Sequence, residues 1–342
     1  MQKILILILL ILFGCNQKSQ FPWSEESIEN LLANNIDKII FIDFYSDTWA
    51  PCARLEAETL NDSKVIDFAK EHFISIKINV DNKEGAEIFS KYGGTRIPYL
   101  IFLNEEGQEI ETSLGFLDVD NFLLLANNVV SNTNTFMSFL KKYQQGDRGP
   151  DLIDKLAYKS EIKNNDSLSI ELYNLILNNQ SEYGQNVIER AEFYIAKLAL
   201  KTDDLSKMND FIDYYKNSDR IRDAYRKLSS YYKNKKDTLS EIGIIKRTVL
   251  IFPDNPSVLN SYAWRLSELN IDLEDALDKI DKALTLTDKN NSSYPNLLDT
   301  KAEVLFRMNL FDEAIKIIDE AISIDNKSQY YKDQKNKFKK SK

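Results

Sequence analysis

The chain has 342 residues, with 44 lysines and arginines against 53 aspartates and glutamates, and a formal net charge of −9 at pH 7. The negative balance, with both signs interspersed, excludes the concentrated basic face that nucleic-acid binding requires. One histidine and two cysteines, far apart in the sequence, argue against a metal site and against a histidine-dependent triad. We therefore expect no cofactor and no metal, and the length predicts two domains of ordinary size.

The N-terminus has the pattern of a secretory signal. Lys3 precedes an apolar run from Ile4 to Phe13, which is too short to span a bilayer as a helix. Leu12-Phe13-Gly14-Cys15 resembles the bacterial lipobox, and this resemblance implies lipidation of Cys15 and a membrane-anchored, periplasm-facing protein of the bacterial envelope. A plain signal peptide is the alternative. We assign residues 1–14 to the signal and residues 15–23 to a polar tether.

Residues 24–130 contain the most informative stretch of the chain. In the strand predicted over Lys38–Tyr45, an apolar run from Ile39 to Tyr45 is interrupted only by Asp43, which indicates burial on both faces. A short polar loop, Ser46–Thr48, leads to Trp49-Ala50-Pro51-Cys52 and then to a helical pattern. A cysteine at the start of a helix lies where the helix dipole favours a thiolate.

Residues 38–117 resemble the thioredoxin superfamily, in particular the domains of bacterial thiol–disulfide interchange proteins. Asp43, Phe44, Tyr45, Pro51 and Cys52 match the family's active-site segment without a gap. The resemblance implies an α/β thioredoxin-like fold. It continues through a long first helix over residues 55–65, a strand over residues 73–81, and a cis-proline loop over residues 92–98.

The resemblance also implies roles for three residues. Trp49 stands where the family has its first, attacking cysteine, so ordinary dithiol catalysis is not expected. Cys52 matches the second, resolving cysteine, and Asp43 matches a buried proton acceptor. If Cys15 is lipidated, Cys52 is the only free thiol of the mature protein. It is then either a structural relic or a single thiol that forms mixed disulfides with clients.

Four residues are candidates for peptide binding. In the family, the cis-proline matched by Pro98 and the backbone of the preceding residue, Ile97, face an extended client. Trp49, beside Pro51, either contacts a client or fills the former active site. These four residues and the two catalytic candidates, Cys52 and Asp43, make up the predicted site.

The sequence pattern predicts amphipathic helices for the remainder of the chain. Residues 131–219 form a helical region without a recognisable register. Residues 220–342 resemble tetratricopeptide repeats and end in a basic, solvated helix; an irregular helical bundle is the alternative. Small, large and turn residues recur at the same offsets in two stretches: Ala263, Asn270, Ala276, Ile280 and Ala283, and again Ala302, Asn309, Ala314, Ile318 and Ala321.

These patterns predict an α/β thioredoxin-like domain followed by an all-α, tetratricopeptide-like repeat domain. The predicted function is an envelope-anchored module that holds polypeptide clients or a partner protein in a folding or thiol–disulfide setting. The alternative is a thiol–disulfide oxidoreductase that works through Cys52 alone. The sequence leaves open which of the two is correct, and hence whether the protein is an enzyme.

Overall fold

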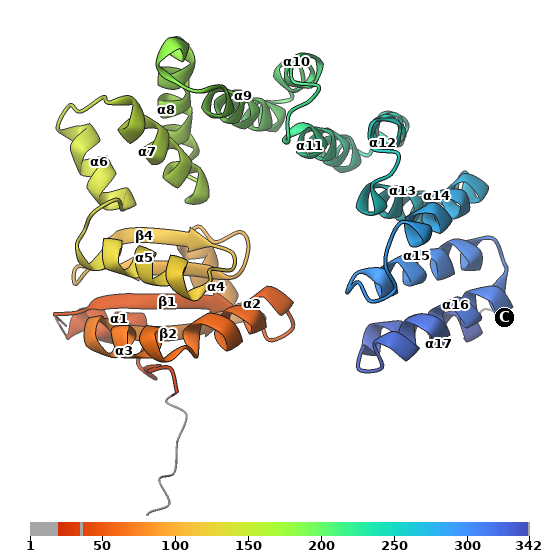
Figure 1. The fold of residues 1–342 in the computed structure, drawn as a ribbon, viewed down its shortest axis with the longest axis horizontal. Coiled ribbons are helices and arrows are strands. Elements are labelled where there is room, and N and C mark those ends of the chain that lie inside the picture. Colours follow the sequence, from red (N-terminus) through yellow and green to blue (C-terminus); the bar gives the residue numbers. More distant parts are fainter. Residues whose placement is uncertain (1–19, 35–36, 341–342) are drawn as a thin grey trace, which may run out of the picture. The chain divides into compact units, whose positions relative to one another are not determined.

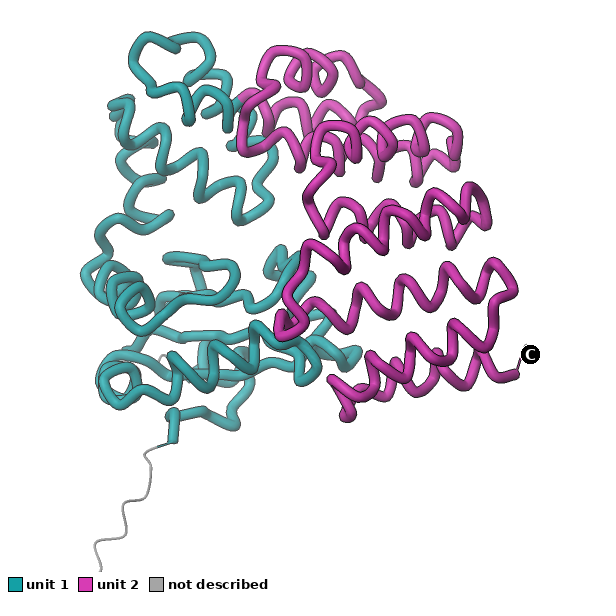
Figure 2. Tube along the Cα trace, turned by 45° about the vertical axis from the view of Figure 1, so that its right-hand side comes forward, with its two compact units in different colours: residues 1–191 teal, residues 192–342 magenta. Residues whose placement is uncertain are grey.

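The computed structural model describes residues 20–34 and 37–340, and the chain divides into two compact units. Unit 1 comprises Met1–Ala191 and unit 2 comprises Glu192–Lys342 (Figure 2). The predicted lipidation site, Cys15, lies outside the described residues. Among the described residues, no helix is both long enough and apolar enough to cross a membrane.

Unit 1 is built on a four-stranded mixed sheet with the order β2-β1-β3-β4 (Figure 1). β1 runs parallel to β2 and antiparallel to β3, and β3 runs antiparallel to β4. The strand predicted from the apolar run is therefore central in the sheet and is buried over five consecutive residues, which confirms the prediction. The strands are β1 (Ile39–Tyr45), β2 (Phe73–Asn79), β3 (Tyr99–Leu103) and β4 (Glu109–Leu114).

Helices cover both faces of this sheet. Phe41 of β1 belongs to a core that also contains buried side chains of α3 and α5, whereas Ile40 and Ile42 belong to a second core with α1. Asp43, two residues after Phe41, therefore lies on the same side of the strand as Phe41. The helices of this α/β part are α1 (Ile28–Ala33), α2 (Ala50–Leu55), α3 (Ser63–His72), α4 (Lys83–Lys91) and α5 (Val119–Val130).

The long first helix predicted over residues 55–65 is wrong in one respect, because the structure divides it. α2 continues into a π-helical turn, Glu56–Leu60, and α3 begins anew at Ser63. The cause is local: the Asp62 side chain accepts a hydrogen bond from the Lys64 amide and so caps α3. The predicted strand after this helix and the cis-proline loop are confirmed.

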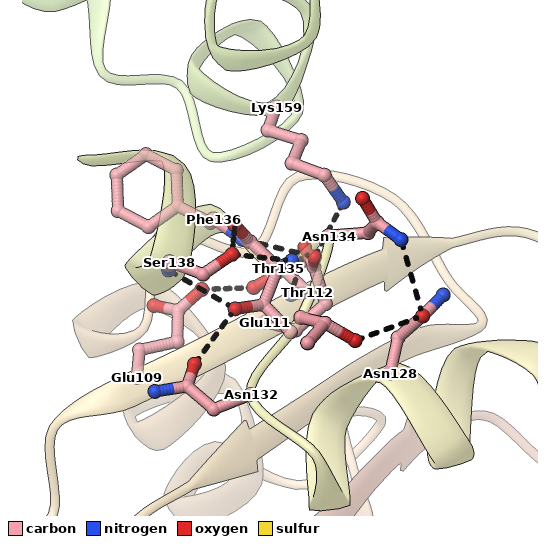
Figure 3. A network of polar contacts seen from close by, with 11 residues as sticks. Glu109, Glu111, Thr112, Asn128, Asn132, Asn134, Thr135, Phe136, Ser138 and Lys159 are labelled. Atoms are coloured by element: carbon pink, nitrogen blue, oxygen red, sulfur yellow. Dashed lines mark hydrogen bonds and ion pairs between the residues drawn. The ribbon is translucent and has the colours of Figure 1, made fainter. Parts of the chain in front are cut away.

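Unit 1 continues beyond α5 into further helices, the first two of which pack on the edge strand β4. They are α6 (Phe136–Gln144), α7 (Pro150–Ile162) and α8 (Asp166–Asn178). Glu111 of β4 is 1% exposed, forms an ion pair with Lys159 of α7 and accepts a hydrogen bond from the Phe136 amide at 3.0 Å (Figure 3). A second ion pair joins Glu109 of β4 to Lys163 at 2.5 Å. The edge strand is thus closed by the chain's own helices.

Unit 2 consists of helices that pack in succession. α13 packs on α14, α15 packs on α16, and the six alanines singled out in the sequence are all fully buried. Asn270 and Asn309, predicted as turn residues, both adopt positive φ, at 55° and 61°. The helices are α9 (Gln185–Ala199, which crosses from unit 1), α10 (Ser206–Tyr214), α11 (Ile221–Asn234), α12 (Thr238–Ile251), α13 (Pro256–Leu269), α14 (Leu273–Thr285), α15 (Tyr294–Arg307), α16 (Phe311–Ile324) and α17 (Gln329–Lys340).

Candidate functional site

The candidate site lies where β1 passes into α2. β1 ends at Tyr45, and the loop that follows is held by the Ser46 hydroxyl, which donates to Asp81 at 2.7 Å and accepts from the Thr48 amide at 3.2 Å. Trp49 then occupies the N-cap position of α2, with Pro51 in the first turn, where proline is well tolerated. The loop and the helix start thus give Trp49 and Cys52 defined positions.

Trp49 and Cys52 differ sharply in accessibility. The Trp49 side chain is 51% exposed, whereas Cys52 is 6% exposed. Burial raises the pKa of the Cys52 thiol, and the Asp43 carboxylate adds to the rise; a hydrogen bond with the Ser46 backbone and the charge of Lys77 oppose it. A thiol whose pKa is raised is mostly protonated at neutral pH and is therefore a weak nucleophile. Cys52 is the only free cysteine among the described residues.

Asp43 is buried in the central strand, with 3% of its surface exposed. Burial raises its pKa to about 7; the charge of Lys77 partly opposes this rise, and the charge of Glu56 adds to it. One carboxyl oxygen, Oδ1, is buried and has no hydrogen-bond partner in the described part of the chain. Asp43 can therefore hold or release a proton near neutral pH, which is the property required of a proton acceptor.

Lys77 and Glu56 belong to this site although the sequence analysis did not select them. Lys77 is the register partner of Asp43 on β2, and its ammonium lies 2.7 Å from the Glu56 carboxylate. The same ammonium lies 4.1 Å from the centre of the Tyr45 ring. A signal was present, because Lys77 is the only charged residue in the mostly apolar strand Phe73–Asn79. Glu56 lies in the π-helical turn after α2, where a charged residue is ordinary and does not indicate a site.

The second part of the predicted site is the loop before β3. The Ile97–Pro98 peptide bond is cis, Pro98 is buried and Ile97 is half-buried. The Gly115 amide donates to the Pro98 carbonyl at 2.8 Å, so this loop lies against the loop after β4. The site residues thus come from two neighbouring places in the sheet, the end of β1 and the start of β3.

A contact from outside the thioredoxin-like region also reaches this loop. The Asn164 side chain, in the turn between α7 and α8, donates to the Gly93 carbonyl at 3.0 Å. The Lys163 carbonyl oxygen also lies beside Gly93: a Cβ added at Gly93 would be 3.4 Å from it. The helical extension therefore contacts the loop that carries Ile97 and Pro98, which the sequence analysis did not predict.

The described residues contain no group of three or more histidine, cysteine, aspartate or glutamate side chains arranged to hold a metal ion. Three side chains of the site carry chemistry of their own. They are one buried thiol, one buried carboxyl with a pKa near neutrality, and one exposed indole at the mouth of the site.

Comparison with known proteins agrees with this geometry. A family model described as a thioredoxin-like domain matches residues 26–129. Thioredoxin-1 of Caenorhabditis elegans is 32% identical over 107 residues, which cover 30% of this chain and 84% of that protein. The thiol:disulfide interchange protein DsbD of Neisseria meningitidis serogroup A is 28% identical over 100 residues, which cover 28% of this chain.

The match to DsbD is partial on both sides, because the chain spans only 16% of the length of that relative. The solved C-terminal domain of Neisseria meningitidis DsbD in its reduced form is 27% identical, with a TM-score of 0.26. That match covers 29% of this chain and 88% of the solved domain.

Proposed function

The chain belongs to the thioredoxin-like family through its N-terminal domain, and from this premise we propose that it is a binding module rather than a dithiol enzyme. In this proposal it holds an extended client polypeptide or a partner protein at a degenerate Trp-Ala-Pro-Cys site. The general setting is thiol–disulfide interchange, which is the activity named for its DsbD relatives.

One observation carries the proposal, namely the contrast between Trp49 and Cys52. An exposed indole takes the place of the attacking thiol, and the remaining thiol is buried with a raised pKa. Exposed aromatic side chains beside a groove are effective contacts for a partner, because they bury a large apolar area and lose little conformational entropy. The site is therefore better suited to binding than to nucleophilic attack.

The loop that carries Ile97 and Pro98 also supports a binding function. It follows Thr95 and Arg96, which are both exposed, and hydrogen bonds anchor it at Pro98 and Gly93. A loop fixed in this way can present its backbone to an extended chain without a large ordering cost. We propose that Trp49, Pro51, Ile97 and Pro98 form the contact surface for the client.

The helices of unit 2 supply a second binding element in this proposal. We propose that α13–α14 and α15–α16 are tetratricopeptide-like repeats. The recurrence of buried alanines at matching offsets and the left-handed turn asparagines support this identification. Each such pair buries its apolar face by stacking on its neighbours and leaves a surface for a partner.

We further propose that the protein is anchored in the bacterial envelope and faces the periplasm. The support is the N-terminal sequence, in which a short apolar run ends at Cys15. Lipidation by more than one acyl chain would give stable attachment to a membrane. Intact mass of the protein isolated from membranes tests this point, because a mass equal to the unmodified chain from Met1 would contradict it.

A second candidate function is a single-thiol oxidoreductase, and the state of Asp43 favours it. A carboxyl with a pKa of about 7 beside Cys52 could accept the thiol proton as the sulfur attacks a client disulfide. The attack would form a mixed disulfide and release the client's other sulfur as a thiol. A low-molecular-weight thiol from solution would then have to regenerate Cys52, because the described chain has no second cysteine.

The alkylation rate of Cys52 across pH, measured by intact mass, separates the two functions. The binding module predicts labelling far slower than that of a free thiol at pH 7, with full labelling only after denaturation. Labelling at pH 7 faster than that of a free thiol would establish an activated thiolate and favour the enzyme.

Binding itself is measured by fluorescence anisotropy with a labelled, reduced, unfolded polypeptide. Trp49→Ala should weaken binding about tenfold, whereas Tyr158→Ala is a matched control because Tyr158 is 50% exposed on α7, within the same unit. Equal binding by the two variants would contradict the proposed contact surface.

A further inference from the structure

A groove in unit 2 has the chemistry of a second binding site. It lies among α11, α12 and α13 and encloses about 470 Å³. The three helices follow one another in Figure 1. Four basic side chains and three acidic ones line the groove, together with one tryptophan and several small polar residues. This local excess of positive charge occurs in a chain whose net charge is −9.

One of the basic side chains is committed to the protein itself. Arg265 makes two hydrogen bonds to Glu241, at 2.7 and 2.8 Å, and a third to Glu268 at 2.9 Å. Glu241 is 2% exposed, so its charge requires this bidentate partner. The Glu241–Arg265 pair therefore braces α12 against α13 and is not available to a ligand.

The other three cations are exposed and only weakly engaged. Arg222 has no hydrogen bond or ion pair with any described residue. Arg226 pairs with Asp223 at 3.1 Å, and Lys233 lies 3.6 Å from Glu268, in both cases with largely solvated side chains. Solvent-exposed ion pairs contribute little to stability, so a ligand carboxylate could replace the internal partner at little cost. These cations are four and then seven residues apart, which places them along one face of α11.

The groove also offers contacts for the rest of a polypeptide. Trp264 is half-buried and presents part of its indole to the groove. Asn260 lines the same groove, and its side-chain oxygen is buried without a hydrogen-bond partner among the described residues. Aromatic and arginine side chains are enriched at the centres of protein interfaces. The buried Asn260 oxygen adds a hydrogen-bond acceptor without a partner among the described residues.

We propose that this groove binds an extended, acidic polypeptide segment of a partner protein, with its carboxylates on Arg222, Arg226 and Lys233 and its apolar side chains on Trp264. This inference rests on the proposed function as a binding module and specifies the chemistry of one partner. With four cations and three carboxylates, the groove lacks the large excess of cations that nucleic acid would require.

The experiment uses the full-length protein in a mild detergent and a short fluorescein-labelled peptide that alternates glutamate with serine and leucine. Fluorescence anisotropy should show binding that weakens with added salt, and at least tenfold weaker binding of the peptide in which glutamine replaces glutamate. Arg222→Glu and Lys233→Glu should each weaken binding of the acidic peptide by about tenfold or more. Lys316→Glu is the matched charge reversal, since Lys316 is exposed on α16 outside the groove.

Equal binding by Arg222→Glu, Lys233→Glu and Lys316→Glu would overturn the inference, as would equal binding of the two peptides. Circular dichroism and thermal midpoints confirm that the variants fold. Trp49→Ala, measured with the same acidic peptide, reports binding at the proposed client site and so separates that site from the groove. A loss confined to Trp49→Ala would assign the peptide to the thioredoxin-like domain and would also overturn the groove.

Discussion

Replacement of Lys159 by methionine should destabilise unit 1 far more than an ordinary surface substitution. Glu111 is 1% exposed, and burial raises its pKa, while Lys159 is the principal group that lowers it again. Lys159→Met would keep most of the side-chain volume and remove the one cation that pairs with this carboxylate among the described residues. Breaking a buried ion pair by removing one partner costs about 3–5 kcal/mol, because an uncompensated charge remains in the interior.

Two hydrogen bonds limit this cost. The amides of Thr112 and Phe136 would still donate to Glu111, at 2.9 and 3.0 Å, so we expect a loss near the lower end, about 3 kcal/mol at pH 8. The loss should be smaller at pH 5. A carboxyl whose pKa is raised in the folded protein costs stability only above its unfolded pKa, and the cost grows until the pH passes the folded pKa.

The assay is urea denaturation followed by tryptophan fluorescence in a Trp264→Phe background, which leaves Trp23 and Trp49 as reporters, both in unit 1. Lys155→Met is the matched control, because Lys155 lies one turn earlier on α7 and pairs with Asp151 at the surface. It should cost less than about 0.5 kcal/mol. The double variant Lys159→Met with Glu111→Gln should recover most of the loss. Equal losses for the two lysine variants, or no recovery, would refute the reasoning.

Two further predictions concern the thioredoxin-like site. Trp49→Cys should restore a dithiol pair with Cys52 and confer insulin-reducing activity, with Trp49→Ser as the inactive control; a folded but inert Trp49→Cys protein would show that the motif is wrongly aligned. Asp43→Asn should remove a pH dependence of stability. Because burial raises the folded pKa of Asp43 to about 7 from 3.8, the native protein should lose up to about 4 kcal/mol between pH 4 and pH 7, and the loss should level off above pH 7. Urea denaturation at several pH values measures this, and parallel profiles for the two proteins would contradict it.

Local patterns predicted the parts of the fold that depend on neighbours in sequence. The apolar run became the central strand, Trp49-Ala50-Pro51-Cys52 became the start of a helix, and Asn270 and Asn309 became left-handed turns. In each case, one short stretch contains both the cause and the result. The alanines at the repeated spacing are buried, because close helix packing leaves room only for a small side chain at those positions.

Contacts between segments far apart in the sequence could not be predicted from local patterns. Glu111 lies on an edge strand, where an acidic residue normally faces water, and its burial depends on Lys159, 48 positions away. The lysine-rich C-terminal stretch was expected to be a solvated helix, yet Tyr331 and Phe338 of α17 are buried against α15 and α16. Those two aromatics are seven residues apart and so share one helix face, which is a signal the many lysines obscured.

Asp43 is the residue that most restricts the interpretation of the site. Its burial without a partner for Oδ1 is costly, and an apolar residue at this point of β1 would fold at least as well. The carboxyl lies close enough to Cys52 for its charge to raise the pKa of the thiol, so ionisation of Asp43 acts on the sulfur. A site that retains this coupling should show a change in the alkylation rate of Cys52 as Asp43 ionises near pH 7, and Asp43→Asn should abolish that change. A rate that follows only the ionisation of the thiol would mean that the carboxyl no longer acts on Cys52, and the binding surface around Trp49 would then be the functional part of this domain.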